Sequence, residues 1–456
     1  MERKNGWEVF STEEKNNVFK FCDEYKEFIS RNKIERKLVN ECVETAEKNG
    51  FKEINKYKNL KKGDKFYKKN KEKEVIFGII GKEILKKGAK FIVSHIDSPR
   101  LDLKTSPIYE DENICLLKTY YYGGIKKYQW LTIPLALYGI VILKTGEKVE
   151  IEIGEKENES IFTITDLLPH LSKDQYKKTI EEGFPGENLN VLFGTIPLTE
   201  KTEEKEKVKK NVIKILKEKY GIEESDFISS ELHFVPAGKG RDAGIDKSMI
   251  LSYGQDDRVC SYTSFRAINE IENPIKSVFC ILVDQEEIGS YGTTSAQSSF
   301  FRYLIEEVVE KTGGTLSDIR ELFENSKAIS ADVDSLLDPN FKEVSDPRNT
   351  ARINCGVVLN KTTGGRGKGG SIEPSAEYIG YIRKIFDQNN VLWQTGEIGK
   401  IEQGGGGTVA TYFARYNIDT IDCGTGVLSM HAPFELTGKI DIYSTYRAYL
   451  SFYKED

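Results

Sequence analysis

The sequence predicts an α/β fold in which helices cover both faces of a mostly parallel central sheet, with a β-rich domain inserted into it. Apolar runs alternate with helical segments over residues 1–106 and 237–456, whereas short β-like runs dominate residues 107–236. A chain of 456 residues is also long for a single hydrophobic core. We therefore predict one domain formed by residues 1–106 and 237–456, interrupted by a second domain over residues 107–236.

The first elements are two amphipathic helices followed by two strands. Ser11 and Glu14 have the spacing of a capping box, and the apolar residues behind them recur at helical spacing. A second amphipathic segment has the same periodicity. The apolar runs 75–80 and 91–93 have the composition of strands, and the second run leads directly to His95.

The later elements alternate strands with helices. The inserted domain is expected to end with a charged helix over residues 203–220. After it we predict strands at 278–283, 328–331 and 420–423, and helices at 295–311, 375–388 and 408–416. This alternation is typical of helices packed on both faces of one sheet.

The composition excludes several classes of protein. The 66 basic and 72 acidic residues are interspersed and give a net charge of -6, so no basic face for nucleic acid is expected. No apolar stretch reaches the ~20 residues that a membrane span requires, and no signal peptide is recognisable, so we predict a cytoplasmic protein that does not bind membranes. The seven cysteines lack any Cys-x-x-Cys pair, which predicts small buried side chains rather than disulfides or a thiolate zinc site.

The chain has only four histidines, so their positions are informative. His95 follows a predicted strand, and Asp97 lies two residues on. In an extended segment both side chains point to the same side, so Asp97 could hold the second ring nitrogen of a metal-binding His95. The alternative for these two residues alone is a structural His-Asp pair.

Acidic residues and another histidine also follow predicted strands. Glu286 and Glu287 directly follow one strand, Asp332 follows the next, and His431 lies just beyond the last. Open α/β sheets bind ligands outside the carboxyl ends of their strands, so these side chains are expected to meet in one site. One of the adjacent glutamates could bind a metal while its neighbour acts as general base.

A further acidic pair, Asp256 and Asp257, precedes Arg258. Its alternative is a helix N-cap with a salt-bridged arginine. Together with the residues at the strand ends, Asp256 completes a set of imidazole and carboxylate ligands that suits Zn²⁺, Mn²⁺ or Co²⁺. Such a set can hold two ions if one carboxylate bridges them, and two ions that share a water catalyse hydrolysis.

Two glycine-rich segments could bind a ligand or could simply be turns. Residues 362–370 lack the spacing of a phosphate-binding loop, which argues against nucleotide binding. Residues 404–407 precede a predicted helix. Their amides could bind a substrate carboxylate, or the glycines could simply allow a tight turn, and the sequence leaves both open.

The motifs resemble those of the bacterial branch of the aspartyl aminopeptidase family of metallopeptidases, from about residue 15 to the C-terminus. The matching segments are Ser94-His95-Ile96-Asp97-Ser98-Pro99, Pro169-His170-Leu171, Gly254-Gln255-Asp256-Asp257-Arg258, Asp284-Gln285-Glu286-Glu287-Ile288-Gly289-Ser290, Ser330-Ala331-Asp332 and Ser429-Met430-His431.

The resemblance implies a centre with two divalent ions, most often zinc, with manganese or cobalt as alternatives. His95 and Asp332 would hold one ion. Glu287 and His431 would hold the other, and Asp256 would bridge the two.

The resemblance also assigns catalytic roles. Glu286 would be the general base that takes a proton from the attacking water and passes it to the leaving amine, and Asp97 would orient His95. His170 lies in the insertion, which in this family is a dimerisation domain, and would reach a neighbouring active site. The implied assembly is a homo-oligomer, a dimer-based tetrahedral dodecamer, and the implied substrates are peptides with a free N-terminus.

The sequence departs from the eukaryotic branch of the family in ways that bear on the substrate. That branch has a histidine where this chain has Ser335, and Asp257 replaces an asparagine. A preference for N-terminal Asp or Glu would need a cation facing the side chain, for which Arg366 and Lys368 are candidates. A related deacylase or carboxypeptidase, and a catalytically silent assembly protein, are the alternative functions.

Overall fold

The computed structural model describes residues 3–199 and 205–455, which form two compact units. The first unit comprises residues 1–97, 240–430 and 435–456, and the second comprises residues 98–239 and 431–434. The predicted insertion, 107–236, falls within the second unit. Residues 203–204, at the start of the predicted charged helix, lie outside the described residues, and that helix begins at Lys207.

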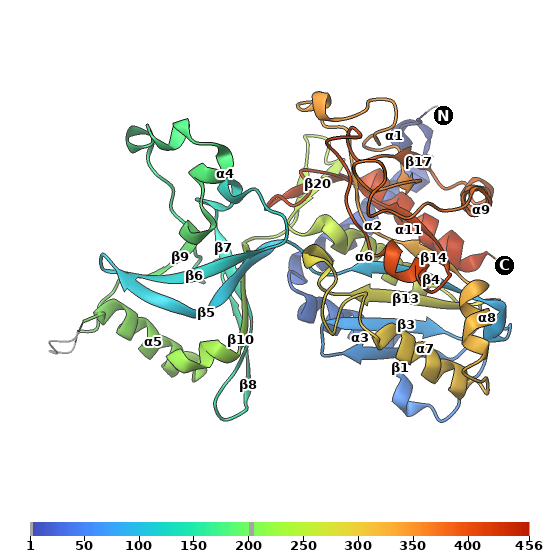
Figure 1. Cartoon of the computed structure of the whole chain (residues 1–456), viewed down its shortest axis with the longest axis horizontal. Helices are drawn as coiled ribbons and strands as arrows, with labels where there is room; N and C mark the ends of the chain where they lie inside the picture. Colours follow the sequence, from blue (N-terminus) through green and yellow to red (C-terminus); the bar gives the residue numbers. More distant parts are fainter. Residues whose placement is uncertain (1–2, 200–204, 456) are drawn as a thin grey trace. The chain divides into compact units, whose positions relative to one another are not determined.

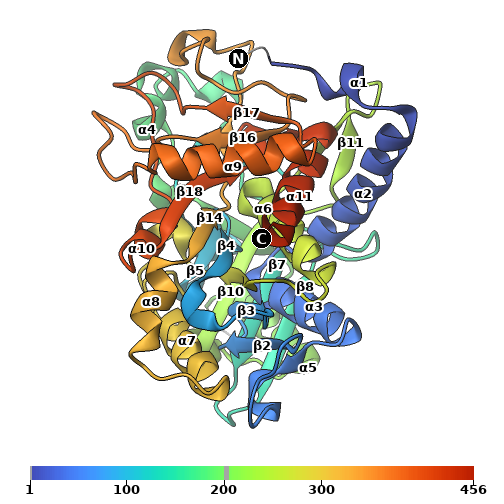
Figure 2. The same ribbon diagram turned by 90° about the vertical axis from the view of Figure 1, so that its right-hand side faces the viewer.

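A nine-stranded sheet forms the centre of the first unit. Its central strands β13, β4, β14 and β18 are parallel to one another, whereas β2, β3 and β16 introduce antiparallel pairings. The order can be followed in Figure 2 from β17 at the top to β2 near the bottom. In sheet order the strands are β1 (Lys52–Glu53), β2 (Lys65–Asn70), β3 (Glu74–Ile79), β13 (Ser277–Val283), β4 (Ala89–His95), β14 (Lys327–Ser330), β18 (Asp419–Gly424), β16 (Val357–Asn360) and β17 (Trp393–Gly396).

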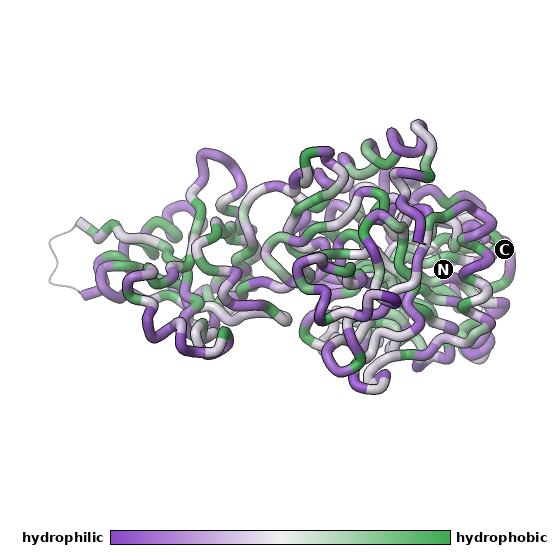
Figure 3. The backbone as a smooth tube through the Cα atoms, turned by 90° about the horizontal axis from the view of Figure 1, so that it is seen from above, coloured by the Kyte–Doolittle hydropathy of each residue, from purple (hydrophilic) through white to green (hydrophobic). Residues whose placement is uncertain are grey.

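Helices cover both faces of this sheet, as predicted. Alternate residues of a strand point to opposite sides, and in the central strands both sets are apolar and need to be covered. In β13, Cys280 and Leu282 join the core under one set of helices, whereas Phe279 and Ile281 join the core under another. Apolar stretches of the backbone are green in Figure 3 and hydrophilic ones purple. The first set comprises α2 (Thr12–Arg31), α3 (Glu35–Lys48), α6 (Gln255–Asn269), α9 (Ala376–Gln388) and α11 (Lys439–Lys454), and the second comprises α7 (Phe300–Lys311), α8 (Asp318–Glu324) and α10 (Ala410–Ala414).

Local sequence explains where several helices begin. The Ser11–Glu14 capping box is present at the start of α2. The predicted helix over 295–311 was too long, because α7 begins only at Phe300. The preceding residues are small and polar, and the Ser295 hydroxyl donates to Gly292 O (3.1 Å), a local bond that competes with helix formation. The predicted helix over 408–416 shortens to Ala410–Ala414.

A smaller five-stranded sheet completes the first unit, together with the short helix α1 (Gly6–Val9). It brings Glu435 next to the start of α6, because β12 pairs with β20. Its strands are, in order, β11 (Arg241–Ala243), β12 (Met249–Ser252), β20 (Glu435–Gly438), β19 (Gly426–Leu428) and β15 (Asp334–Ser335).

The second unit is built on a six-stranded antiparallel sheet. The helix α5 (Lys207–Tyr220) packs against β5, β6 and β9 (Figure 1), and α4 (Ile180–Gly183) is a single turn. The strands are, in order, β8 (Lys148–Ile153), β7 (Leu135–Ile142), β10 (Ser230–Pro236), β5 (Arg100–Asp111), β6 (Ile114–Tyr122) and β9 (Asn190–Gly194). Among the described residues of the whole chain, no helix combines the length and apolarity that crossing a bilayer would require.

Candidate metal centre

The carboxyl ends of the parallel strands bring the predicted residues of the first unit together. His95 is the last residue of β4 and is paired with Val283, the last residue of β13. The turn η8 (Glu286–Ile288) follows β13 and carries both glutamates. Asp332 follows β14, which pairs with β4 on its other side. The sheet register therefore places three of the predicted segments around one strand end.

His95 lies at the middle of this group and is buried. Its Nε2 is 3.2 Å from Asp256 Oδ1 and 3.6 Å from Asp332 Oδ1. Its Nδ1 lies 3.1 Å from Asp97 O and 3.3 Å from Asp97 Oδ1. A proton on Nδ1 facing Asp97 would leave Nε2 directed at the two aspartates, where a cation would be coordinated.

Asp97 also contacts the turn that carries the glutamates. Its Oδ1 accepts a hydrogen bond from Glu286 N (3.2 Å) and its Oδ2 accepts one from Glu287 N (3.1 Å). Gln285, just before them, has a left-handed backbone (φ 65°), which turns the chain sharply out of β13. One buried carboxylate thus fixes both His95 and the glutamate turn.

Asp256 and Asp257 lie at the start of α6. Both have non-helical backbone angles, so the regular helix starts after them and their side chains are not confined to its outer surface. Glu435 Oε2 accepts a hydrogen bond from Asp256 N (3.1 Å), and Asp257 Oδ2 accepts one from His95 N (3.3 Å). Neither aspartate is the N-cap, which is Gly254.

The pKa values of His95 and of the acidic residues around it reflect the concentration of negative charge in this buried cluster. Burial opposes protonation of His95, but hydrogen bonds to Asp256, Asp332 and Asp97 raise its pKa well above the ordinary value. Burial and the carboxylate of Asp256 raise the pKa of Asp332, although His95 acts to lower it. Burial and the neighbouring carboxylates raise the pKa of Glu286 to about 8. So many carboxylates buried close together cannot all be ionised unless protons or cations compensate their negative charge.

The donor atoms fit a divalent cation. Ligand atoms of His95, Asp256 and Glu287 lie within 4.8 Å of one another, and so do those of His95, Asp257 and Asp332. Imidazole nitrogen with carboxylate oxygens is a set that binds Zn²⁺, Mn²⁺ and Co²⁺. When bound, a cation would replace the proton that the carboxylates now favour on His95.

The two remaining predicted residues belong to the second unit. His431 Nδ1 lies 2.8 Å from Gly124 O, a contact that favours the tautomer in which Nε2 would coordinate. His170 is exposed in the turn η4 (Pro169–Leu171). Their part in the centre stays a prediction.

Two residues of the site were missed by the sequence analysis. Asp257 contributes to one of the candidate ligand groups, and Glu435 holds the backbone of Asp256. The adjacent acidic pair was a usable signal for Asp257. Glu435 had no local signal, because it is 179 residues from Asp256 in the chain.

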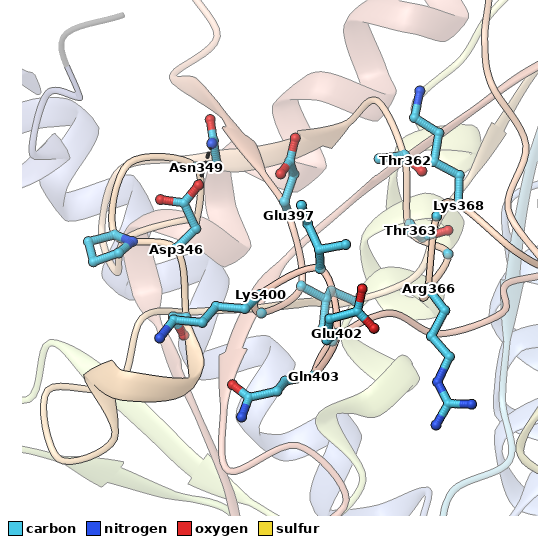
Figure 4. Close-up of a pocket in the computed structure, with 18 residues that line it drawn as sticks. Asp346, Asn349, Thr362, Thr363, Arg366, Lys368, Glu397, Lys400, Glu402 and Gln403 are labelled. Carbon is cyan, nitrogen blue, oxygen red and sulfur yellow. Dashed lines mark hydrogen bonds between the residues drawn. The ribbon is translucent and has the colours of Figure 1, made fainter.

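The glycine-rich segments line a pocket of about 960 Å³ in the first unit (Figure 4). A side chain on Gly404 would collide with Ile398 O, and one on Gly405 with the backbone at Gly365, so the glycines allow two loops to pack closely. Arg366 and Lys368 both line this pocket, and their side chains point in opposite directions from their loop. Lys368 is paired with Glu373 (2.6 Å).

Known proteins resemble this chain over its full length. The family model described as Aminopeptidase I zinc metalloprotease (M18) matches residues 28–453. A protein of Clostridium acetobutylicum named probable M18 family aminopeptidase 1 is 47% identical over 456 residues, covering 99% of this chain and 98% of that protein.

Solved structures agree with the sequence match. The crystal structure of an M18 family aminopeptidase from Thermotoga maritima has a TM-score of 0.96 and 43% identity, covering 100% of both chains. That of aminopeptidase I from Clostridium acetobutylicum has a TM-score of 0.93 and 45% identity, also over 100% of both chains. The S. cerevisiae mApe1 dodecamer shares the fold, with a TM-score of 0.77 at 22% identity over 96% of this chain and 97% of that one. The chain therefore belongs to the M18 family of zinc metalloproteases, and it is an aminopeptidase.

Proposed function

We propose that the centre around His95 holds two divalent ions and that the enzyme removes the first residue of peptides with a free N-terminus. One observation carries the proposal: His95 belongs to two candidate ligand groups, one with Asp256 and Glu287 and one with Asp257 and Asp332. His431 is proposed to complete the ligand set. Zinc is the proposed native metal, with manganese or cobalt as the alternatives.

The protein residues have separate roles in this proposal. When bound, the two cations would lower the pKa of the attacking water, polarise the scissile carbonyl and hold the free amine. Glu286 accepts the proton of the water and delivers it to the leaving amine. Its pKa, raised to about 8 by burial without the ions, would be lowered by their charge, so that it is ionised as a base. Asp97 keeps Glu286 in place through the backbone.

We further propose that the enzyme forms an oligomer and is located in the cytoplasm. The exposed turn with His170 is proposed to reach the active centre of a neighbouring subunit, with the second unit serving as a dimerisation domain. The dodecamer known for the S. cerevisiae relative is the proposed size of the assembly. The proposed compartment is the cytoplasm.

Acidic first residues are the proposed preferred substrates. Lys368 is already paired with Glu373, so the proposed partner of the substrate carboxylate is Arg366. Replacing Arg366 by alanine should raise KM for peptides that begin with Asp or Glu about 10-fold and leave KM for those that begin with Leu unchanged. Lys368→Ala is the matched control in the same pocket. Equal KM changes for acidic and apolar peptides would remove Arg366 from the specificity.

The first test distinguishes an aminopeptidase from a deacylase or a carboxypeptidase. Peptides with free and acetylated N-termini, otherwise identical, are incubated with zinc-, manganese- or cobalt-loaded enzyme. The proposal predicts release of the first residue from the free peptide only. Equal turnover of both peptides would contradict it, and an inert protein that retains no metal would favour the assembly protein.

A further inference from the structure

The loop that carries Glu286 and Glu287 is closed at its base by Asp284. Asp284 directly follows β13, and its backbone N–H donates a hydrogen bond to Thr294 O (3.0 Å). The buried carboxylate of Asp284 also accepts a hydrogen bond from the Thr294 hydroxyl at Oδ2 (2.9 Å). One aspartate therefore joins the two ends of the loop 284–294, and the way it is held bears on where both glutamates lie.

The tip of the hairpin formed by β2 and β3 packs against the base of this loop. Lys73 Nζ lies 3.5 Å from Asp284 Oδ2, and the Asp284 side chain is only 2% exposed. At the other end of the loop, Lys71 Nζ donates to Thr293 Oγ1 (2.9 Å) and Asn70 Nδ2 donates to Thr293 O (2.6 Å). Three side chains of the hairpin tip therefore contact the two ends of the loop.

Lys73 supplies positive charge where a buried carboxylate needs it. Glu74, the first residue of β3, is buried near Asp284 and accepts a hydrogen bond from Asn70 Nδ2 (2.8 Å). Burial is the main cause that raises the pKa of Glu74 to about 8, and the charge of Asp284 adds to it. Glu74 is therefore largely protonated at neutral pH and does not compete with Asp284 for Lys73. Without a counter-charge, a buried ionised carboxylate is costly.

We propose that Lys73 is a positioning residue for the proposed general base, because through Asp284 it sets where the turn with Glu286 lies. Asp97 holds the backbone amides of the same turn, so the turn is fixed both from the end of β4 and from the hairpin. A displacement of about 1 Å at a reacting group can lower a rate about 100-fold. This inference rests on the proposed role of Glu286 and adds a residue that lies outside the metal centre.

The experiment compares Lys73→Met and Lys73→Arg at saturating zinc, well below the unfolding temperature of each variant. Methionine keeps the apolar stem of the side chain but not its charge. We expect Lys73→Met to lower kcat about 10–100-fold and to leave KM within about 2-fold of the wild type, because the base acts in the transition state rather than in substrate binding. Lys73→Arg should restore most of kcat. Lys69→Met, on the same hairpin, is the matched control and should keep the wild-type kcat.

Two further variants show whether the effect passes through the loop to Glu286. In Glu286→Gln the base is already absent, so adding Lys73→Met should lower the residual rate no further, whereas independent effects would multiply. Thr294→Val removes the hydroxyl that donates to Asp284 and should lower kcat in the same way as Lys73→Met. Thr294→Ser keeps the hydroxyl and is its control.

The possible results separate this inference from the proposed function. A purely structural role would lower the melting temperature of Lys73→Met and leave kcat of the folded, zinc-loaded enzyme unchanged, and that result would overturn the inference. A lack of rescue by arginine, or a further fall in the double variant, would also overturn it. Full activity of Glu286→Gln by itself would instead overturn the proposed general base.

Discussion

The carboxylate of Asp97 links two parts of the centre that are far apart in the sequence. It contacts the His95 ring and accepts hydrogen bonds from Glu286 N and Glu287 N, which are 189 and 190 residues away. The carboxylate of Asp97 therefore helps to set the position of the proposed general base relative to the proposed metal-binding histidine. Positioning of this kind is what separates a catalytic centre from a cluster of acids.

The role of Glu286 gives the sharpest prediction for one residue. Glu286→Gln keeps the shape of the side chain but cannot accept a proton. We expect kcat to fall by about 10²–10⁴-fold, while metal content and thermal stability stay at wild-type values. Stopped assays with metal analysis of the same samples check this. Full activity in the variant would show that another group is the base.

The sequence shows which residues follow strand ends. Apolar runs mark the strands that precede His95, Asp332 and the glutamate pair, and the structure has those strands. Glu435 was not found, because its hydrogen bond to Asp256 N is made only when β20 pairs with β12. Side chains that act through tertiary contacts have no such local pattern.

The end of β18 packs closely against the backbone of Asp332 and restricts its position on that side. A side chain on Gly424, at the end of β18, would lie 1.9 Å from Asp332 O and 3.0 Å from Cys260 Sγ. Only a glycine lets β18 pass this close to the segment that carries Asp332, a proposed ligand. Gly424 therefore shapes the centre although it contributes no donor atom to it.

The variant Gly424→Ala should therefore damage the centre without removing any ligand. We expect a loss of about 1–3 kcal/mol in stability from overpacking, and weaker metal binding because Asp332 is displaced. Gly406→Ala is the control, since a side chain there meets nothing within 4 Å. Thermal unfolding and metal titration of both variants provide the comparison. If the two variants behave alike, the contact with Asp332 O does not matter.

In the second unit, a hydrogen-bonded pair of side chains connects β5 to β10. Asp102 Oδ1 lies 2.5 Å from His233 Nδ1 and 2.8 Å from Arg100 Nε, and Asp102 and His233 are register partners. Burial opposes ionisation of Asp102, but Arg100 and His233 together lower its pKa. His233 is the one histidine of the sequence that the predicted site does not include, and it pairs with Asp102 within this sheet.

That lowered pKa sets a pH dependence. Because the folded pKa lies below that of the unfolded chain, about 3.9, ionised Asp102 stabilises the fold above about pH 4, and this contribution is lost as the pH falls through the folded pKa. Asp102→Asn should cost about 1–3 kcal/mol at pH 7, and the difference from the wild type should shrink towards pH 3. Urea unfolding at several pH values measures it, with the exposed Asp111→Asn as control. A difference that is constant with pH would contradict the assignment.

Element boundaries were harder to predict than element types. The strands β13 and β14 start and end within one residue of the predicted runs, because strands buried on both faces are continuously apolar. The start of α7 was misplaced by five residues, since 295–299 are small or polar and form local hydrogen bonds instead. Apolar periodicity alone does not reveal that competition.

At the scale of the whole molecule, the alternation of strands and helices was sufficient to predict the fold. The exact division of the chain was not predictable from composition. Residues 431–434 belong to the second unit, although the segments on both sides of them belong to the first. A segment of four residues is too short to be recognised from its composition. This segment includes His431, which is proposed as a metal ligand.

The proposed role of His170 across a subunit boundary can be tested by complementation. We expect His170→Ala to lower the rate without changing metal content. Mixed oligomers of His170→Ala and Glu286→Gln chains should regain some activity, because an intact His170 from one chain can serve the intact base of another. Unmixed oligomers of each variant are the controls. If the mixed oligomers show no increase in activity after dissociation and reassembly, His170 acts within its own subunit or has no part in catalysis.

The most direct test of the two-ion centre is a zinc titration of the metal-free enzyme, with bound ions and the rate of N-terminal residue release measured on the same samples. If the centre holds two ions, binding should saturate at two ions per chain and substantial activity should appear only as the second site fills. Full activity at one ion per chain would contradict it.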